Sequence, residues 1–140
     1  MAIKDSIFIK TTSRLKDITF EKKSNSWYLK FDNDISFSLY TIWRLFKNDT
    51  VTLISNDHGQ QFGLPKTVDL IAGLKSYLDN KILKEIQVEK NTGDLILNFD
   101  EKEKLVAYIS SMGYESYEIF IDGKQFIAQG GGEIAIFQIK

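Results

Sequence analysis

Two stretches of the chain, 68 positions apart, carry nearly the same sequence. LKDITFEKKSNSWYLKFD begins at Leu15 and LKEIQVEKNTGDLILNFD begins at Leu83. The match runs without a gap from residues 15–40 to residues 83–108, and HGQQF at 58–62 then aligns with DGKQF at 122–126 after a slip of four. We therefore predict two structurally similar halves, residues 15–63 and 83–127, related by an internal repeat. The alternative is a chance match between two similar alternation patterns.

Each half has the pattern of antiparallel strands. DITFEK and WYLKFD alternate apolar and polar residues on either side of the turn cluster KSNS, and EIQVEK and LILNFD do the same around NTGD. Alternation with a period of two indicates strands with one buried face. A third and a fourth strand follow in each half, so we expect about four strands per half, with further strands near the C-terminus.

An amphipathic helix is predicted between the halves, at about residues 67–80. Thr67 is a candidate N-cap, and Gly73, which weakens a helix by about 1 kcal/mol relative to alanine, suggests close packing at that point. Apolar residues recur here at the helical spacings of three and four, at Val68, Ile71, Leu74 and Leu78. The fold class expected is α+β, with two antiparallel β-rich halves joined by one helix that covers one opening between them.

Composition limits the class of protein. With 140 residues, of which 43% are hydrophobic, the chain is expected to form a single domain over residues 1–140. A net charge of −1 disfavours nucleic acid as the partner. The chain has no cysteine, no apolar signal core at its start and no segment long enough to span a membrane, so we expect a cytoplasmic protein without membrane association. The pattern of residues 1–13 fits both an edge strand and a loose arm.

Few residues offer catalytic chemistry. The only histidine, His58, follows Asp57 and precedes Gly59 in SNDHGQQFG, where we predict a hairpin turn; a catalytic or metal-binding role is the alternative. Without cysteine and with one histidine, a metal site with several such ligands is excluded by composition. We expect no enzymatic activity, no metal and no cofactor.

A run of three glycines, Gly130, Gly131 and Gly132, precedes the last predicted strand. We interpret it as a tight turn, a bulge or a close backbone contact. An anion-binding nest of backbone amides is the alternative, but the helix that follows a phosphate-binding loop is absent from the pattern.

Aromatic and charged residues stand together in IWRLF and GYESYEIF. Because a buried arginine needs a carboxylate to offset its desolvation, we predict that Arg44 pairs with Glu115 or Glu118; the alternative is that all three are solvated. Bases of a single-stranded nucleic acid can stack on such aromatic residues, but the two glutamates would repel its phosphates. The candidate ligand- or partner-binding residues are Trp43, Arg44, Tyr114, Glu115 and Tyr117.

The same residues carry a resemblance. WR at Trp43, D.GQ.FG from Asp57 through Gly59 to Gly63, YES.E at 114–118 and the terminal GGG.IAIF resemble a family of small, functionally uncharacterised bacterial proteins over about residues 27–137. Some members of that family look like immunity proteins of bacterial toxin systems. The resemblance implies no known reaction.

These observations favour a non-enzymatic protein-binding protein, with an immunity protein that neutralises a cognate bacterial toxin as its specific form. Such a protein needs a rigid scaffold and a surface complementary to one partner. Exposed sheet edges would also allow a homodimer. The alternative is a small-ligand-binding or regulatory module that uses the crevice between the halves.

Overall fold

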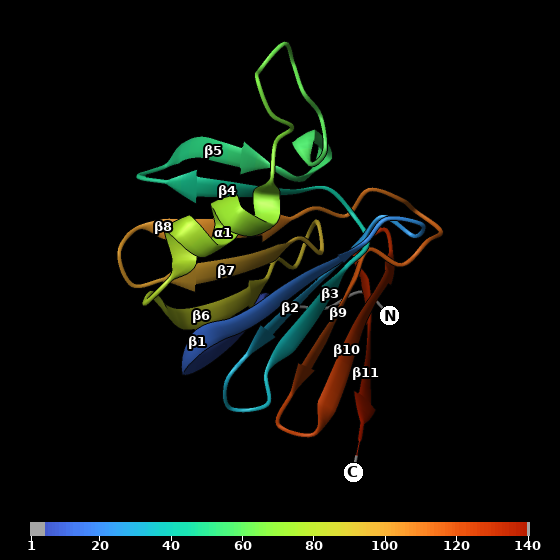
Figure 1. Cartoon of the computed structure of the whole chain (residues 1–140). Coiled ribbons are helices and arrows are strands. Elements are labelled where there is room, and N and C mark those ends of the chain that lie inside the picture. The colour runs from blue at the N-terminus through green and yellow to red at the C-terminus, as the bar shows by residue number, and fades with distance from the viewer. Residues whose placement is uncertain (1–4, 140) are drawn as a thin grey trace.

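A computed structural model describes residues 5–139 as one antiparallel sheet and one α-helix (Figure 1). The sheet has eleven strands in the order β11-β10-β9-β3-β2-β1-β6-β7-β8-β4-β5. Their bounds are β1 (Ile7–Glu21), β2 (Ser26–Phe31), β3 (Ser36–Leu39), β4 (Trp43–Lys47), β5 (Thr50–Ile54), β6 (Ile82–Val88), β7 (Leu95–Phe99), β8 (Glu103–Ala107), β9 (Tyr117–Ile121), β10 (Lys124–Gly130) and β11 (Glu133–Gln138). The antiparallel sheet with one helix is as predicted, but the strands form one continuous sheet, not two.

The sheet is built around β1 and β6, which pair antiparallel at its centre. Each begins a three-stranded meander, β1-β2-β3 on one side and β6-β7-β8 on the other. The chain then crosses over, so that β4 pairs with β8 and β9 pairs with β3. The first part of β1, residues 7–14, pairs with β6 alone, and β2 pairs with β1 only from Leu15 onward. These first residues are therefore a strand with one neighbour and not a loose arm; residues 1–4 lie outside the described part.

The alternating sequence pattern decides which side chains enter the core. In β2, Trp27, Leu29 and Phe31 are buried while Tyr28 and Lys30 are exposed, as expected for a strand with one buried face. Strong twist and coiling bring distant strands into contact on the buried side. The rings of Trp27 in β2 and Trp43 in β4 meet edge to face at 5.2 Å.

The helix α1 spans Leu70–Leu78, shorter at both ends than predicted. Its buried side chains are Leu70, Leu74 and Leu78. It contacts β1 and β5, and in Figure 1 it lies in front of β4, β8 and β7. The close packing expected at Gly73 is present, because a Cβ there would lie 3.3 Å from Leu53 Cδ1. Within residues 5–139, no helix has the length and apolar character needed to cross a bilayer.

The N-cap of α1 is Asp69 and not Thr67, the predicted cap. Asp69 Oδ1 accepts hydrogen bonds from the backbone N–H groups of Ile71 and Ala72, each at 3.1 Å. These contacts satisfy two of the amides that a helix leaves unpaired at its start. Asp69 also places a negative charge at the positive end of the helix dipole, which adds to the preference for this position.

Replacing Asp69 by alanine is therefore expected to lower the free energy of unfolding by about 1 kcal/mol, because both cap hydrogen bonds are lost. The matched control is Thr67→Ala, which should change it by less than about 0.5 kcal/mol. Urea unfolding followed by circular dichroism measures both. Equal losses in the two variants would contradict the assignment of the cap.

The segment around His58 is not the predicted hairpin turn. Ser55–Asp57 forms a short 3-10 helix, and the chain continues through a projecting loop to α1 (Figure 1). Residues 58–62 thus lie in a loop, while residues 122–126 form the β9–β10 turn and the start of β10. The two matched stretches, HGQQF and DGKQF, have different local structures.

Candidate functional site

The predicted site residues do not form one cluster. Trp43 and Tyr117 are fully buried, because each occupies an inward position of its strand. Arg44 lies on the outer face of β4, half-buried, and Tyr114 and Glu115 are exposed in the loop that joins β8 to β9. Only the last three present surface to a partner or ligand.

The predicted ion pair of Arg44 with Glu115 or Glu118 is wrong. Arg44 Nε and Nη2 donate instead to the hydroxyl oxygen of Tyr108, at 3.0 and 2.7 Å. Glu118 lies on β9, across the sheet, where its carboxylate accepts hydrogen bonds from the Tyr40 hydroxyl and the Gln125 amide. Because β4 pairs with β8 and β9 pairs with β3, Arg44 and Glu118 lie in opposite halves of the sheet.

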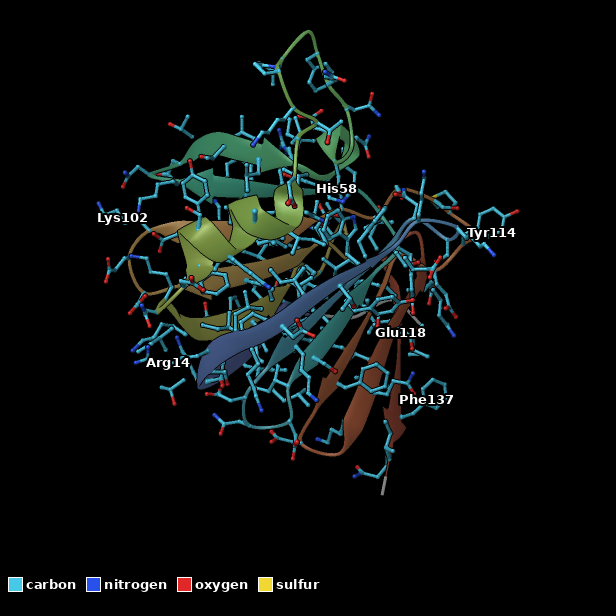
Figure 2. The ribbon with its side chains drawn as sticks, in the orientation of Figure 1. Arg14, His58, Lys102, Tyr114, Glu118 and Phe137 are labelled. Atoms are coloured by element: carbon cyan, nitrogen blue, oxygen red, sulfur yellow. The ribbon has the colours of Figure 1, made fainter. Side chains whose placement is uncertain are left out.

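The most prominent surface feature is the loop of residues 109–116, here named the crossing loop. Met112 is 85% exposed and Tyr114 81% exposed, the highest values among the large hydrophobic residues that the structure describes. Figure 2 shows Tyr114 at the tip of the loop, pointing away from the sheet. Exposed aromatic and methionine side chains are typical of protein interfaces.

Hydrogen bonds hold the backbone of the crossing loop in place. Ser111 Oγ accepts from the N–H groups of Gly113 and Tyr114, at 3.0 and 2.9 Å. At the start of the loop, Asp94 Oδ1 accepts from the N–H of Ile109 at 2.8 Å. The two exposed side chains therefore stand on a fixed backbone, which lowers the entropy lost when a partner binds.

The glycine run supports this loop from behind. Gly130, Gly131 and Gly132 all have positive φ; Gly130 ends β10, and Gly131 and Gly132 form the tight turn to β11, as predicted. The Gly131 N–H donates to the carbonyl oxygen of Ser111 at 3.1 Å. A Cβ on Gly130 would lie 2.7 Å from the carbonyl oxygen of Met112. The three glycines thus allow a close contact between two backbones.

The sequence signal for the crossing loop is a difference in length between two connections. The strands β3 and β4 are joined by three residues, 40–42, whereas β8 and β9 are joined by nine, Tyr108 and the eight residues of the crossing loop. Only Tyr114 and Glu115 of this loop were identified as candidates from the sequence. Met112 was missed, although an extra exposed segment in one of two similar halves is a common place for binding residues.

A second exposed apolar surface lies at one edge of the sheet. Among the strands of residues 5–139, the last, β11, pairs with β10 alone, and Ile136 and Phe137 are about half exposed. Figure 2 shows Phe137 at this edge, remote from Tyr114. An unpaired edge with apolar side chains is suited to pairing with another strand, which is the geometry that a homodimer would use.

The buried Tyr117 fixes the base of the crossing loop. Its hydroxyl donates to the carbonyl oxygen of Gly93 at 2.7 Å. Burial, and secondarily the nearby Asp94 carboxylate, raise the pKa of the Tyr117 phenol above its ordinary value. Because the folded-state pKa exceeds the unfolded value of about 10, this contribution to stability is complete below pH 10 and is lost as the pH rises above it.

His58 is part of the packing around α1. Its Nδ1 accepts a hydrogen bond from the N–H of Leu70, the first residue of the helix, at 3.0 Å. The imidazole also lies 4.9 Å from the ring centres of Phe20 and Trp27. These contacts assign His58 a structural role. Among residues 5–139 no three His, Cys, Asp or Glu side chains lie close enough together to hold a metal ion.

The remaining residues of the predicted structural motif, Asp57, Gly59 and Gly63, lie near His58 in the sequence. Asp57 ends the 3-10 helix, and Gly59 and Gly63, both with positive φ, belong to the projecting loop between β5 and α1. The N–H of Gly59 donates to the carbonyl oxygen of Val68 at 2.9 Å, which closes the base of this loop.

Comparison with protein families, curated proteins and solved structures finds no match for this chain.

Proposed function

We propose that this chain is a non-enzymatic, cytoplasmic, single-domain protein-binding protein whose partner docks on the crossing loop. In its specific form it is an immunity protein that neutralises a cognate bacterial toxin. The observation that carries the proposal is the pair Met112 and Tyr114, which are highly exposed on a backbone held by hydrogen bonds.

The energetics of interfaces favour this surface. A few large side chains, tyrosine prominent among them, supply most of the binding energy of a typical interface. Burying these two exposed apolar side chains under a partner removes apolar surface from water and therefore favours the complex. The neighbouring Glu115 is exposed and supplies a negative charge beside the apolar pair, so a partner with a basic rim around an apolar pocket fits best.

The resemblance to bacterial proteins that include immunity-like members supports a toxin domain as the partner. An immunity protein acts by occupying a toxin surface, and this requires neither nucleophile nor cofactor. The free edge of β11 offers a further surface for a partner strand or for a second copy of the chain.

The proposal is tested by co-expression with the product of the neighbouring gene and by affinity capture from the native host, read by mass spectrometry. We expect the wild-type protein to retain a stoichiometric partner whose toxicity or enzymatic activity falls on binding. The double variant Met112→Ser with Tyr114→Ser should weaken this complex at least 100-fold, which corresponds to two hot-spot contacts of about 1.4 kcal/mol each.

The matched control is Phe62→Ser, since Phe62 is 66% exposed but lies on the projecting loop before α1. This variant should bind like the wild-type protein. Circular dichroism should show that all variants fold. If the bait returns alone, or if the double variant binds as tightly as the control, the proposed docking surface is incorrect.

We also infer that β1–β5 and β6–β10 are two copies of one ancestral unit. The strand order supports this. If β1 corresponds to β6, β2 to β7, and so on to β5 and β10, then swapping every strand with its counterpart gives the same order of the ten strands, read from the other end of the sheet. In this interpretation β11, α1 and the longer crossing loop distinguish the copies. The crossover of β4 and β9 is then an exchange of hairpins between the copies.

A second candidate function is small-ligand binding beside Arg44. A shallow pocket of about 410 Å³ is lined by Ile42, Arg44, Ile54 and Tyr108, within the usual size range of ligand sites. A thermal-shift screen with no protein partner present tests this candidate, since a bound ligand raises the melting temperature.

A further inference from the structure

The guanidinium of Arg44 is held in a fixed position on the outer face of β4. Its Cζ lies 5.1 Å from the centre of the Phe46 ring and 5.0 Å from that of Tyr108. Two of its nitrogens, Nε and Nη2, donate to the Tyr108 hydroxyl. Aromatic contacts and hydrogen bonds of this kind orient a guanidinium before any ligand arrives.

This cation has no anionic partner in the part of the chain that the structure describes. None of the ion pairs within residues 5–139 includes Arg44. Lys104 Nζ lies 5.2 Å from the centre of the Phe46 ring and adds a second positive charge. Two positively charged side chains therefore stand near this pocket, although the chain as a whole carries a net charge of −1.

One edge of the guanidinium remains without an acceptor among residues 5–139. Tyr108 occupies the edge formed by Nε and Nη2. The Nη1–Nη2 edge keeps one hydrogen on each nitrogen. These two parallel donors match the two oxygens of a carboxylate.

The rest of the pocket wall is apolar. Ile42 and Ile54 line it together with Arg44 and Tyr108. A hydrated inorganic anion gains little from such a wall, whereas an apolar group is stabilised there by its removal from water. We propose that this pocket binds a small organic monocarboxylate, with the carboxylate on the open edge of Arg44, which Tyr108 holds in position, and the apolar body against the two isoleucines.

In the opposite half of the sheet, Tyr40 occupies the position that corresponds to Tyr108, and it is hydrogen-bonded to a carboxylate of the chain itself, that of Glu118. Glu118 pairs with Ser38 of β3, two residues before Tyr40, and Arg44 pairs with Val106 of β8, two residues before Tyr108. In the first arrangement the Tyr40 hydroxyl donates to the Glu118 carboxylate. In the second, arginine replaces glutamate, so the tyrosine faces a cation, and a carboxylate bound there would come from outside the chain.

The test uses the full chain and four probes: hexanoate and benzoate, with hexanamide and benzamide as uncharged isosteres. We expect both carboxylates to shift the NMR resonances of Ile42, Ile54 and Tyr108 with dissociation constants below about 1 mM. The amides should bind at least tenfold more weakly, because they cannot pair with the guanidinium charge.

Two variants and two matched controls locate the site. Arg44→Gln removes the cation and Tyr108→Phe removes the hydroxyl while keeping the ring; each should weaken carboxylate binding at least tenfold. Glu118→Gln and Tyr40→Phe make the same kinds of change at the corresponding pair on the other half and should leave binding unchanged. Circular dichroism and melting temperature confirm that each variant is folded.

The inference rests on the second candidate function, ligand binding, and uses no residue of the crossing loop. Absence of carboxylate binding below about 1 mM, or binding that survives both Arg44→Gln and Tyr108→Phe, overturns it. Equal binding of acids and amides also overturns it but leaves a ligand site in the pocket. The co-expression experiment separately decides the role of the crossing loop.

Discussion

Replacing Trp27 by alanine is expected to lower the free energy of unfolding by about 3–5 kcal/mol. The indole is 1% exposed and touches three other rings, those of Phe20, Trp43 and His58. It therefore connects β1 and β2 with β4, on the far half of the sheet, and with the segment that leads into α1. Removing it opens a cavity where these parts meet, and a rigid core does not close such a cavity completely.

Urea unfolding followed by tryptophan fluorescence of Trp43 and by circular dichroism measures this loss. A domain of this size has a total stability of about 5–15 kcal/mol, so the loss is a large fraction of the total and should lower the melting temperature by many degrees. Tyr28→Ala, on the outer face of the same strand, serves as the control and should cost less than about 1 kcal/mol. A loss below about 1 kcal/mol in Trp27→Ala would show that Trp27 does not join the two parts of the core.

Local features of the fold were predictable from the sequence because they depend on neighbouring residues. The alternation in WYLKFD placed Trp27, Leu29 and Phe31 on one face, and the structure buries all three. The helical spacing identified α1, although its start was misplaced by choosing Thr67 over Asp69. Both residues are good caps, and the choice depends on the direction of the chain as it leaves the preceding loop.

The crossover of the two hairpins was not predictable in the same way. A buried strand has the same pattern whether it pairs within its own half or with the other, so the alternation in Trp43 and Leu45 does not specify β8 as the neighbour of β4. Pairing Arg44 with a glutamate assumed that two motifs far apart in the sequence meet in space. The strand order instead places β4 and β9 in opposite halves of the sheet.

The candidate site illustrates the same limit. Tyr114 and Tyr117 stand three residues apart in GYESYEIF, yet the first is 81% exposed and the second fully buried. The sequence contained a signal for the difference, because Tyr117 alternates with Ile119 and Ile121, which indicates an inward strand position. Tyr114 lies outside that alternation. Applying the strand period to each aromatic residue would have separated core positions from surface positions.

Replacing Gly130 by alanine is expected to lower the free energy of unfolding by about 2–5 kcal/mol, through backbone strain and a backbone clash together. The φ of Gly130 is 128°, a region that residues with a Cβ rarely adopt. The added methyl group would also lie 2.7 Å from the carbonyl oxygen and 2.8 Å from the carbonyl carbon of Met112. Neither backbone can move without breaking the hydrogen bond between Gly131 and Ser111.

The consequence reaches the proposed binding surface, since the crossing loop must shift to relieve the contact. Gly113→Ala is the matched control within the same loop, because a Cβ there meets nothing within 4 Å and its φ is ordinary. It should change stability by less than about 0.5 kcal/mol and leave partner binding intact. If hydrogen exchange and urea unfolding show Gly130→Ala to be as stable as Gly113→Ala, the turn does not support the crossing loop. If Gly130→Ala also loses the partner under conditions where it remains folded, the fixed position of Met112 and Tyr114 is what the partner recognises.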